Sequence, residues 1–116
     1  MATTPLLQLL QGYLDVASNR QQLIVSNMAN VDTPGYHTKD LDFHAAMTRV
    51  MANGDQSSLE PVSQEVPGLM ERPDGNNVSI DRESLLLSQT QLQYQMGVQL
   101  IRAEFSRLLT AIKGGS

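Results

Sequence analysis

The sequence predicts a mainly α protein in which long N- and C-terminal helices pair as a coiled-coil-like hairpin, joined by a loop-rich middle segment with at most a short β element. Apolar residues make up 41% of the 116 residues, but only 4% are aromatic and none is Trp, so the interior must be aliphatic, which suits helix-on-helix packing. Long helices are possible only at the two ends, because four of the five prolines lie in the middle: Pro34, Pro61, Pro67 and Pro73.

The N-terminal segment, residues 6–29, carries an apolar residue every three or four positions. One line of residues comprises Leu7, Leu10, Leu14, Ala17, Gln21, Ile24, Met28 and Val31, with Gln21 as its polar exception. A second line runs beside it through Leu6, Leu9, Tyr13, Val16, Arg20 and Leu23. Together they predict a helix whose apolar face is broader than a two-stranded coiled coil requires, so we expect contacts with more than one neighbouring helix.

A second long helix is predicted to start at Asp81, whose side chain can cap free backbone N–H groups. Gln89 to Met96 alternate as a strand would, but Gln, Leu and Met are good helix formers, and the seven-residue repeat continues through them. Gly12 and Gly97 fall inside the two helices, either at close helix contacts or as tolerated surface positions. Spacings of four and three link Leu87, Gln91, Tyr94, Val98, Ile101, Phe105, Leu108 and Ile112, before Gly114 and Gly115 end the helix.

The middle of the chain is expected to hold a short helix and a loop. Asp42 can cap a helix whose apolar residues are Phe43, Ala46, Met47, Val50 and Met51. Residues 55–77 are predicted to form a flexible acidic loop that closes with a turn at Asp74-Gly75, followed by a very short strand at Val78 and Ile80. The chain is therefore divided into paired terminal helices (1–31 and 78–113), a turn plus short helix (32–54) and the loop (55–77).

Composition and charge exclude several functions. The net charge is -4 and no cluster of Lys and Arg could follow a phosphate backbone, so nucleic acid is not an expected partner. The chain has no Cys, no defensible Ser/His/Asp arrangement and no phosphate-binding Gly loop, which argues against an enzyme, a cofactor or a small-molecule substrate. No metal site is expected either, because Asp42 already has a capping role and no third element completes the cluster of His37, Asp40, Asp42 and His44.

The run Asn27-Met28-Ala29-Asn30-Val31-Asp32-Thr33-Pro34-Gly35-Tyr36 closes the first helix. Pro34 presets φ for the second position of a turn, and Gly35 permits the positive φ of a type II third position. The run closely resembles the Asn-x-Ala-Asn-x-x-Thr-Pro-Gly-Tyr signature near the N-terminus of flagellar rod and hook proteins. Its matching residues are Asn27, Ala29, Asn30, Thr33, Pro34, Gly35 and Tyr36.

The resemblance continues through residues 39–43 and 74–78 and covers roughly two thirds of the chain. It fails between Asp55 and Arg72, a stretch that looks short for the family. Most rod and hook proteins end in an Arg-x-Tyr-x-Ala-Asn type helix, whereas this chain reads Gln93-Tyr94-Gln95-Met96 and runs on to Ile112. That departure favours the proximal rod subunits within the family.

The resemblance implies a structural subunit of the proximal rod of the bacterial flagellar basal body, which lies in the periplasm. Such subunits leave through the type III export apparatus without a cleaved signal peptide, and the segment Leu6 to Leu10 indeed lacks the charged and apolar regions of a signal. Expected partners are other copies of the chain, other rod proteins and the export gate.

Two groups of residues follow as candidate sites. Phe43 and Met47 resemble the Phe-x-x-x-hydrophobic motif by which early flagellar subunits engage the export gate, although both also fit the buried face of a short helix. The alternative function, a small cytoplasmic helical adaptor or secretion chaperone, explains the helices but not the signature. The expected assembly seam consists of Leu7, Leu10, Leu14, Ile24, Leu87, Tyr94, Val98, Ile101, Phe105, Leu108 and Ile112.

Overall fold

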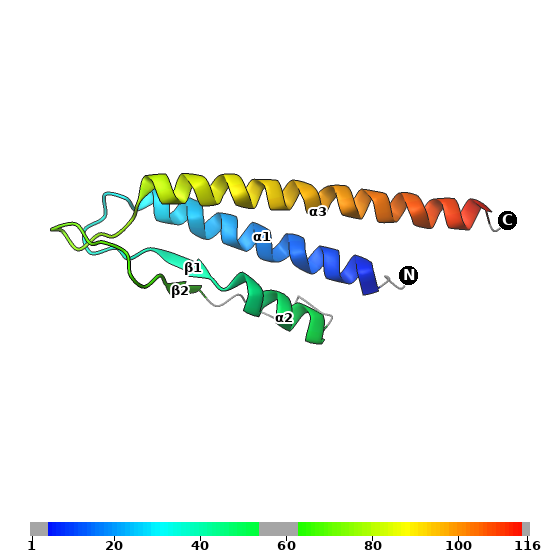
Figure 1. The fold of residues 1–116 in the computed structure, drawn as a ribbon, viewed down its shortest axis with the longest axis horizontal. Coiled ribbons are helices and arrows are strands. Elements are labelled where there is room, and N and C mark those ends of the chain that lie inside the picture. The colour runs from blue at the N-terminus through cyan, green and yellow to red at the C-terminus, as the bar shows by residue number, and fades with distance from the viewer. Residues whose placement is uncertain (1–4, 54–62, 115–116) are drawn as a thin grey trace.

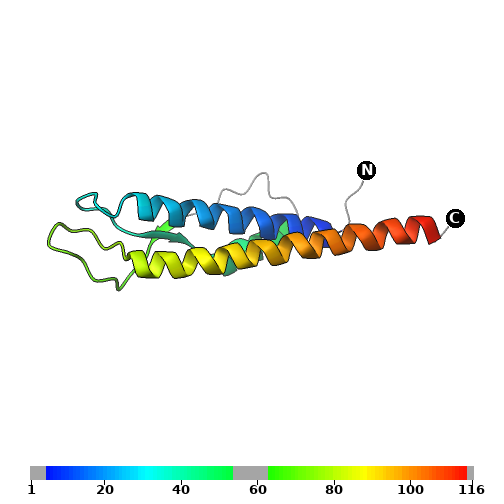
Figure 2. The same ribbon diagram turned by 90° about the horizontal axis from the view of Figure 1, so that it is seen from above.

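The computed structural model describes residues 5–53 and 63–114. Its elements are α1 (Pro5–Ala29), β1 (Lys39–Leu41), α2 (Phe43–Asn53), β2 (Ser63–Glu65) and α3 (Ile80–Gly114). The long helices α1 and α3 lie side by side in opposite directions, and α2 and the strands lie on the other side of α1 (Figure 1, Figure 2). The molecule is elongated, measuring 68 × 25 × 18 Å. Two long terminal helices and a small sheet confirm the predicted mainly α hairpin.

The broad apolar face of α1 is shared between two neighbours, as its sequence predicts. Val16 is buried with Leu41 of β1 and Val50 of α2 in the hydrophobic core. On the adjacent side of α1, Tyr13 and Leu14 lie against Gly97 of α3. Five partly buried side chains complete the core beside α2: Leu9, Leu23, Phe43, Ala46 and Met47.

The small elements are fixed by polar contacts. The carboxylate of Asp42 accepts a hydrogen bond from the Ala45 N–H at 3.1 Å, which confirms the predicted cap of α2. Strand β1 pairs with β2 in antiparallel fashion, with Lys39 opposite Glu65. The Arg20 guanidinium binds both carboxylate oxygens of Asp40 at 3.1 Å, and this partly buried ion pair ties β1 to α1.

Two local predictions were wrong at the start of α3. Val78 and Ile80 form no strand: the Val78 N–H donates to the Asn76 side chain at 2.8 Å instead of to a strand partner, and Ile80 already belongs to α3. The capping residue is Ser79 rather than Asp81, because the Ser79 hydroxyl accepts the Arg82 N–H at 3.3 Å. Within the range expected to be loop, Ser63–Glu65 form β2. Residues 54–62 of that range lie outside the described residues.

Candidate assembly site

The most completely bonded side chain of the signature is Asn27, which lies at the end of the hairpin where α1 stops. Its carbonyl oxygen accepts hydrogen bonds from the Tyr36 hydroxyl and the Lys39 N–H, each at 3.1 Å. Its amide donates to the Lys39 carbonyl at 2.8 Å and to the Glu83 carboxylate at 2.5 Å. Only 1% of Asn27 is exposed to solvent. A single buried amide therefore joins α1, β1 and α3.

Glu83 gives this junction a buried negative charge. Its side chain is fully buried, and its second carboxylate oxygen accepts a hydrogen bond from Arg82 at 2.8 Å. The carboxylate lies in the first turn of α3, where the partial positive charge of a helix N-terminus stabilises an anion. A buried charge costs several kcal/mol unless it is paired and hydrogen-bonded, so Asn27 and Arg82 are what permit Glu83 at this position.

The turn that follows α1 has the geometry its sequence predicts. The Tyr36 N–H donates to the Thr33 carbonyl at 3.2 Å, and Gly35 has a φ of 75°, as the third position of a type II turn requires. Asn30 closes the helix by donating its side-chain amide to the Ser26 carbonyl at 2.8 Å and accepting the Thr33 hydroxyl at 3.0 Å.

A second loop, residues 74–78, packs against this turn. The fully buried Asn76 donates its amide to the carbonyls of Asn30 and Thr33, at 2.9 and 2.8 Å. Gly35 donates to the Asp74 carbonyl at 2.8 Å, and a Cβ added at Gly75 would lie only 3.3 Å from the Gly35 Cα. Gly75 is thus required both by its φ of 85° and by this close approach.

Asn77 and Arg72 complete the junction. The Asn77 side chain accepts the Thr38 N–H at 2.6 Å, and its own N–H donates to the Tyr36 carbonyl at 3.2 Å. The Arg72 guanidinium donates to the Val31 carbonyl. We call this network the asparagine clasp, and its members are Asn27, Asn30, Asn76, Asn77 and Glu83.

The signature in the sequence identified two of the five members of the clasp. Asn27 and Asn30 were expected as part of the signature, whereas residues 74–78 were predicted only as a turn and a short strand, and no contact with the first loop was predicted for them or for Glu83. The other signature residues lie nearby: Ala29 ends α1, and Pro34 is exposed in the turn. The spacing of Asn residues in both loops was the available signal, but nothing in a linear sequence shows that loops some 45 residues apart meet.

The expected seam residues fall into three groups. On α1, Leu7, Leu10 and Ile24 are buried and Leu14 is half-buried. On α3, the half-buried members are Leu87, Val98, Ile101 and Leu108. The exposed members are Tyr94, Phe105 and Ile112. The hairpin therefore uses part of the seam and leaves the rest uncovered in the single chain.

The most buried line of α3 is one that apolar periodicity missed. Glu83, Thr90, Gly97 and Glu104 are buried and lie seven residues apart, so they share one face of the helix. A Cβ at Gly97 would lie 2.7 Å from the Leu14 side chain and 2.9 Å from the Tyr13 ring, so α1 and α3 approach closely here. Of the two explanations offered for Gly97, close helix contact is the correct one.

Glu104 is paired along its own helix, whereas Glu83 is also bound by Asn27 of α1. Arg107 donates two hydrogen bonds to the Glu104 carboxylate, at 2.6 and 3.1 Å. These hydrogen bonds hold the pKa of Glu104 below its ordinary value and raise the pKa of Arg107.

The candidate export residues lie in the core. The Phe43 ring meets the Tyr13 ring edge to face, with centroids 5.7 Å apart, and burial raises the pKa of the Tyr13 hydroxyl. Met47 is partly buried against the same core. Both side chains are therefore packing residues in the folded chain, which leaves their role during export as a separate question.

Three of the four residues considered as metal ligands contact other groups. His37 lies between two carboxylates, with Nε2 2.8 Å from Glu71 and Nδ1 3.6 Å from Glu65. Asp40 binds Arg20 and Asp42 caps α2, while His44 is exposed. Residues 5–53 and 63–114 contain no group of three potential ligands placed to hold a metal ion. Within the same residues, no helix is long and apolar enough to span a bilayer.

These features define an elongated structural protein, a helical hairpin closed at one end by the clasp. No family model matches the chain. A flagellar basal body rod protein FlgB of Cereibacter sphaeroides is 32% identical over 113 residues, which cover 87% of this chain and 88% of that protein. The FlgB of Salmonella typhimurium is 29% identical over 126 residues, covering 91% of each chain, and that of Yersinia enterocolitica is 28% identical over 125 residues. The chain belongs to the FlgB family of flagellar basal body rod proteins, and it is a structural component of that rod.

Proposed function

We propose that the chain polymerises within the flagellar rod through the uncovered faces of its terminal helices. The observation that carries this proposal is a row of exposed apolar side chains on α3, which we call the outer stripe: Leu85, Leu92, Met96 and Leu100. Their spacings of seven and four place them on one face, turned away from the buried line that meets α1. Contiguous apolar surface of this kind marks interaction sites, and burying it contributes about 25 cal/mol per Å².

The architecture we propose places the terminal segments, residues 1–31 and 78–113, which contain α1 and α3, in the inner wall of a helical tube. Residues 32–54 and the acidic segment 55–77 face outward. Contacts between unlike surfaces that do not close into a ring generate such a helical array. The partners are other copies of the chain and other rod proteins, and the rod that they form lies in the periplasm.

We also propose that the chain reaches the rod through the type III export apparatus, without a cleaved signal peptide. Phe43 and Met47 would engage the export gate while the chain is unfolded and enter the core after folding. The support for this role is the match of their spacing to the gate motif. Their exposure differs between the two stages, so packing and gate recognition are compatible.

Leu108→Asp tests assembly. Leu108 is half-buried near the end of α3, and a carboxylate there would remove apolar contact and place an unpaired charge in the subunit interface, at a cost of about 3 kcal/mol per subunit. We expect a secreted subunit but no completed rod and no swimming, measured by motility assay with immunoblots of the cell and secreted fractions. Ser63→Asp makes an equal charge change at an exposed position of β2, and cells that carry this variant should swim normally. Normal swimming by Leu108→Asp would contradict the assembly proposal.

Phe43→Ala tests export. We expect its secretion to fall while its cytoplasmic level stays detectable, as measured by the same immunoblots. Val50→Ala is the matched control, since Val50 packs in the same core but lies outside the gate motif. Equal secretion losses in both variants would reduce Phe43 to a packing residue.

A further inference from the structure

The two long helices differ in length, and the difference falls at one end. α1 has 25 residues and α3 has 35. Asn27 bonds to Glu83, and Gly97 meets Tyr13 and Leu14, so a single antiparallel register applies along the hairpin. That register places Pro5 opposite residue 105 or 106. Residues 106–114 therefore extend past the described part of α1, by roughly 13 Å at 1.5 Å per residue. Figure 1 shows the C-terminal end of α3 running beyond the start of α1. We call them the overhang.

The overhang is apolar and basic. Leu109 is 55% exposed and Ile112 is 71% exposed. The overhang contains two basic side chains, Arg107 and Lys113, and no acidic side chain, and Arg107 is paired with Glu104 just before the overhang. A helix end with this chemistry fits an uncharged surface that is bordered by negative charge.

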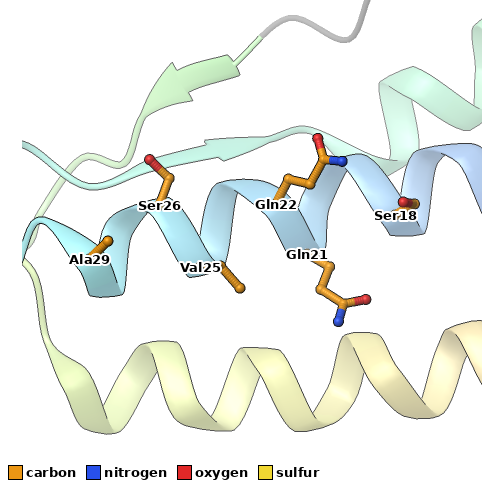
Figure 3. Close-up of a pocket in the computed structure, with 6 residues that line it drawn as sticks. All are labelled: Ser18, Gln21, Gln22, Val25, Ser26 and Ala29. Carbon is orange, nitrogen blue, oxygen red and sulfur yellow. The ribbon is translucent and has the colours of Figure 1, made fainter.

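The exposed side of α1 offers such a surface. Six residues line a shallow hollow of about 490 Å³ there (Figure 3): Ser18, Gln21, Gln22, Val25, Ser26 and Ala29. None of them is charged, and the small side chains of Ser18, Ser26 and Ala29 allow a helix to approach closely. Val25, which is half exposed, supplies an apolar contact within the hollow. We call this surface the α1 hollow.

The loops at the same end of the molecule as the α1 hollow carry the complementary charge. Ala29 lies directly before the first of two loops, residues 31–38 and 66–78, which contain three acidic side chains, Asp32, Glu71 and Asp74, against one basic side chain, Arg72. Glu71 also contacts His37, and Asp74 contacts Arg72. Met70, which is almost fully exposed, adds an apolar contact in the same loops. The clasp end and the overhang end of the molecule are therefore opposite in charge.

We propose that the overhang of one copy docks in the α1 hollow of a second copy, so that subunits contact head to tail. This inference rests on the proposed polymerisation and specifies one of its interfaces. All six residues that line the hollow belong to α1, so the hollow is present in the single chain before docking. Charge of opposite sign at the two ends sets the direction of the contact.

The contact cannot form within one chain. Val25 lies opposite residue 85 or 86 in the register of the hairpin, and Leu109 is more than 20 residues further along α3. That separation corresponds to roughly 35 Å, far beyond the reach of a short cross-link.

Engineered cysteines test the contact, and no native thiol can form a competing cross-link because the chain has no Cys. Purified Val25→Cys and Leu109→Cys proteins, one of them tagged, are mixed at concentrations where sedimentation shows self-association, and treated with a short bis-maleimide. We expect the Val25→Cys and Leu109→Cys pair to give at least about five times more mixed dimer than the control pair of Met51→Cys and Leu109→Cys. Docking brings residues 25 and 109 of two chains together and so raises the effective concentration of that pair alone. Met51 is 65% exposed on α2, away from the hollow. The yield should fall several-fold when the ionic strength rises from about 50 to about 500 mM.

The outcomes are distinct. Chains that self-associate but give equal yields for both pairs overturn the head-to-tail contact and leave polymerisation standing. Chains that stay monomeric at every concentration count against both proposals. A third experiment uses the double variant Ala2→Cys/Leu109→Cys at high dilution. If it forms a cross-link within single chains, and Val25→Cys and Leu109→Cys give no mixed dimer, the chain's own N-terminus covers the overhang. That result would also overturn the inference.

Discussion

At the scale of single residues, Asn27 makes four hydrogen bonds to three different segments. Asn27→Ala would remove one of the two hydrogen-bond partners of the buried Glu83 carboxylate, leaving Arg82, and would also remove the partner of the Tyr36 hydroxyl and of the Lys39 backbone. We expect the free energy of unfolding to fall by about 3 kcal/mol, because removing one partner of a buried charge leaves the charge uncompensated. Urea unfolding measures this change.

Gln11→Ala is the control for Asn27→Ala. Gln11 lies on the same helix but is exposed, so its replacement should change stability by less than about 0.5 kcal/mol. If Asn27→Ala also stays within that range, the clasp is a by-product of the turn and contributes little to stability.

Glu104 predicts a pH dependence at the other end of the hairpin. Hydrogen bonds from Arg107 lower its pKa from the ordinary value of 4.5, so its stabilising contribution is present above that pH and is lost as the pH falls through the lowered pKa. Arg107→Gln should therefore be less stable than the parent near neutral pH, and the difference should shrink in acid. Urea midpoints at several pH values measure it.

Arg102→Gln provides the matched comparison for Arg107→Gln. Arg102 is exposed and carries the same charge, but Glu104 is bonded to Arg107 instead. The difference in free energy of unfolding between Arg102→Gln and the parent should stay constant with pH. A constant difference for Arg107→Gln as well would mean that the Glu104 pair does not persist in solution.

Local chemistry could be predicted at this scale, and distant pairing could not. Pro34 and Gly35 carry the information for their turn, because φ preferences belong to the residues themselves. Asp42 could be identified as a cap for the same reason. Glu83 and Asn76 could not be assigned, since their partners Asn27 and Asn30 are 56 and 46 residues away.

At the scale of elements, the spacing between α1 and α3 is set where Gly97 meets Tyr13 and Leu14. A helix-interior Gly→Ala change normally stabilises by about 1 kcal/mol. At Gly97 the added Cβ would overlap both side chains, and Tyr13 cannot move freely because its ring meets Phe43. We expect Gly97→Ala to destabilise by about 1–2 kcal/mol in thermal or urea unfolding.

Gly114→Ala separates this packing effect from helix propensity. A Cβ at Gly114 would meet nothing within 4 Å, so that variant should be neutral or slightly more stable. Stabilisation by Gly97→Ala would show that α1 and α3 are further apart in solution than in the structure.

Apolar periodicity predicted where the helices lie but not which face of α3 meets α1. The pattern found the apolar line through Leu87 and Ile101, yet the most buried line holds Glu83, Thr90, Gly97 and Glu104. A close helix contact favours small residues such as Gly97, and a carboxylate such as that of Glu83 can be buried when it is paired. A count of large apolar residues does not detect either kind of position. The strand predicted at Val78 and Ile80 failed because an Asn76 side-chain bond took the place of strand pairing.

At the scale of the whole molecule, the outer stripe predicts how subunits behave in solution. Leu92 is 60% exposed, so Leu92→Glu should leave the helical circular dichroism of the monomer unchanged. We expect it to weaken concentration-dependent self-association, measured by sedimentation, since a charge would have to be desolvated in the contact. Gln95→Glu, an equal charge change on the same helix, should have a smaller effect. Equal self-association by Leu92→Glu and the parent would exclude the outer stripe from the contact.

The asparagine clasp has a further consequence for the chain between its two loops. Asn76 bonds to the carbonyls of Asn30 and Thr33, so the segment between residues 36 and 74 leaves the hairpin and returns to it at one place. Its ends are fixed together whatever lies between them. In polymer terms, doubling the length of such a closed loop costs only about 0.6 kcal/mol of closure entropy. Leu41 and Val50 within this segment form the core with Val16, so β1 and α2 have to stay, but extra residues inserted between α2 and β2 should cost the hairpin little.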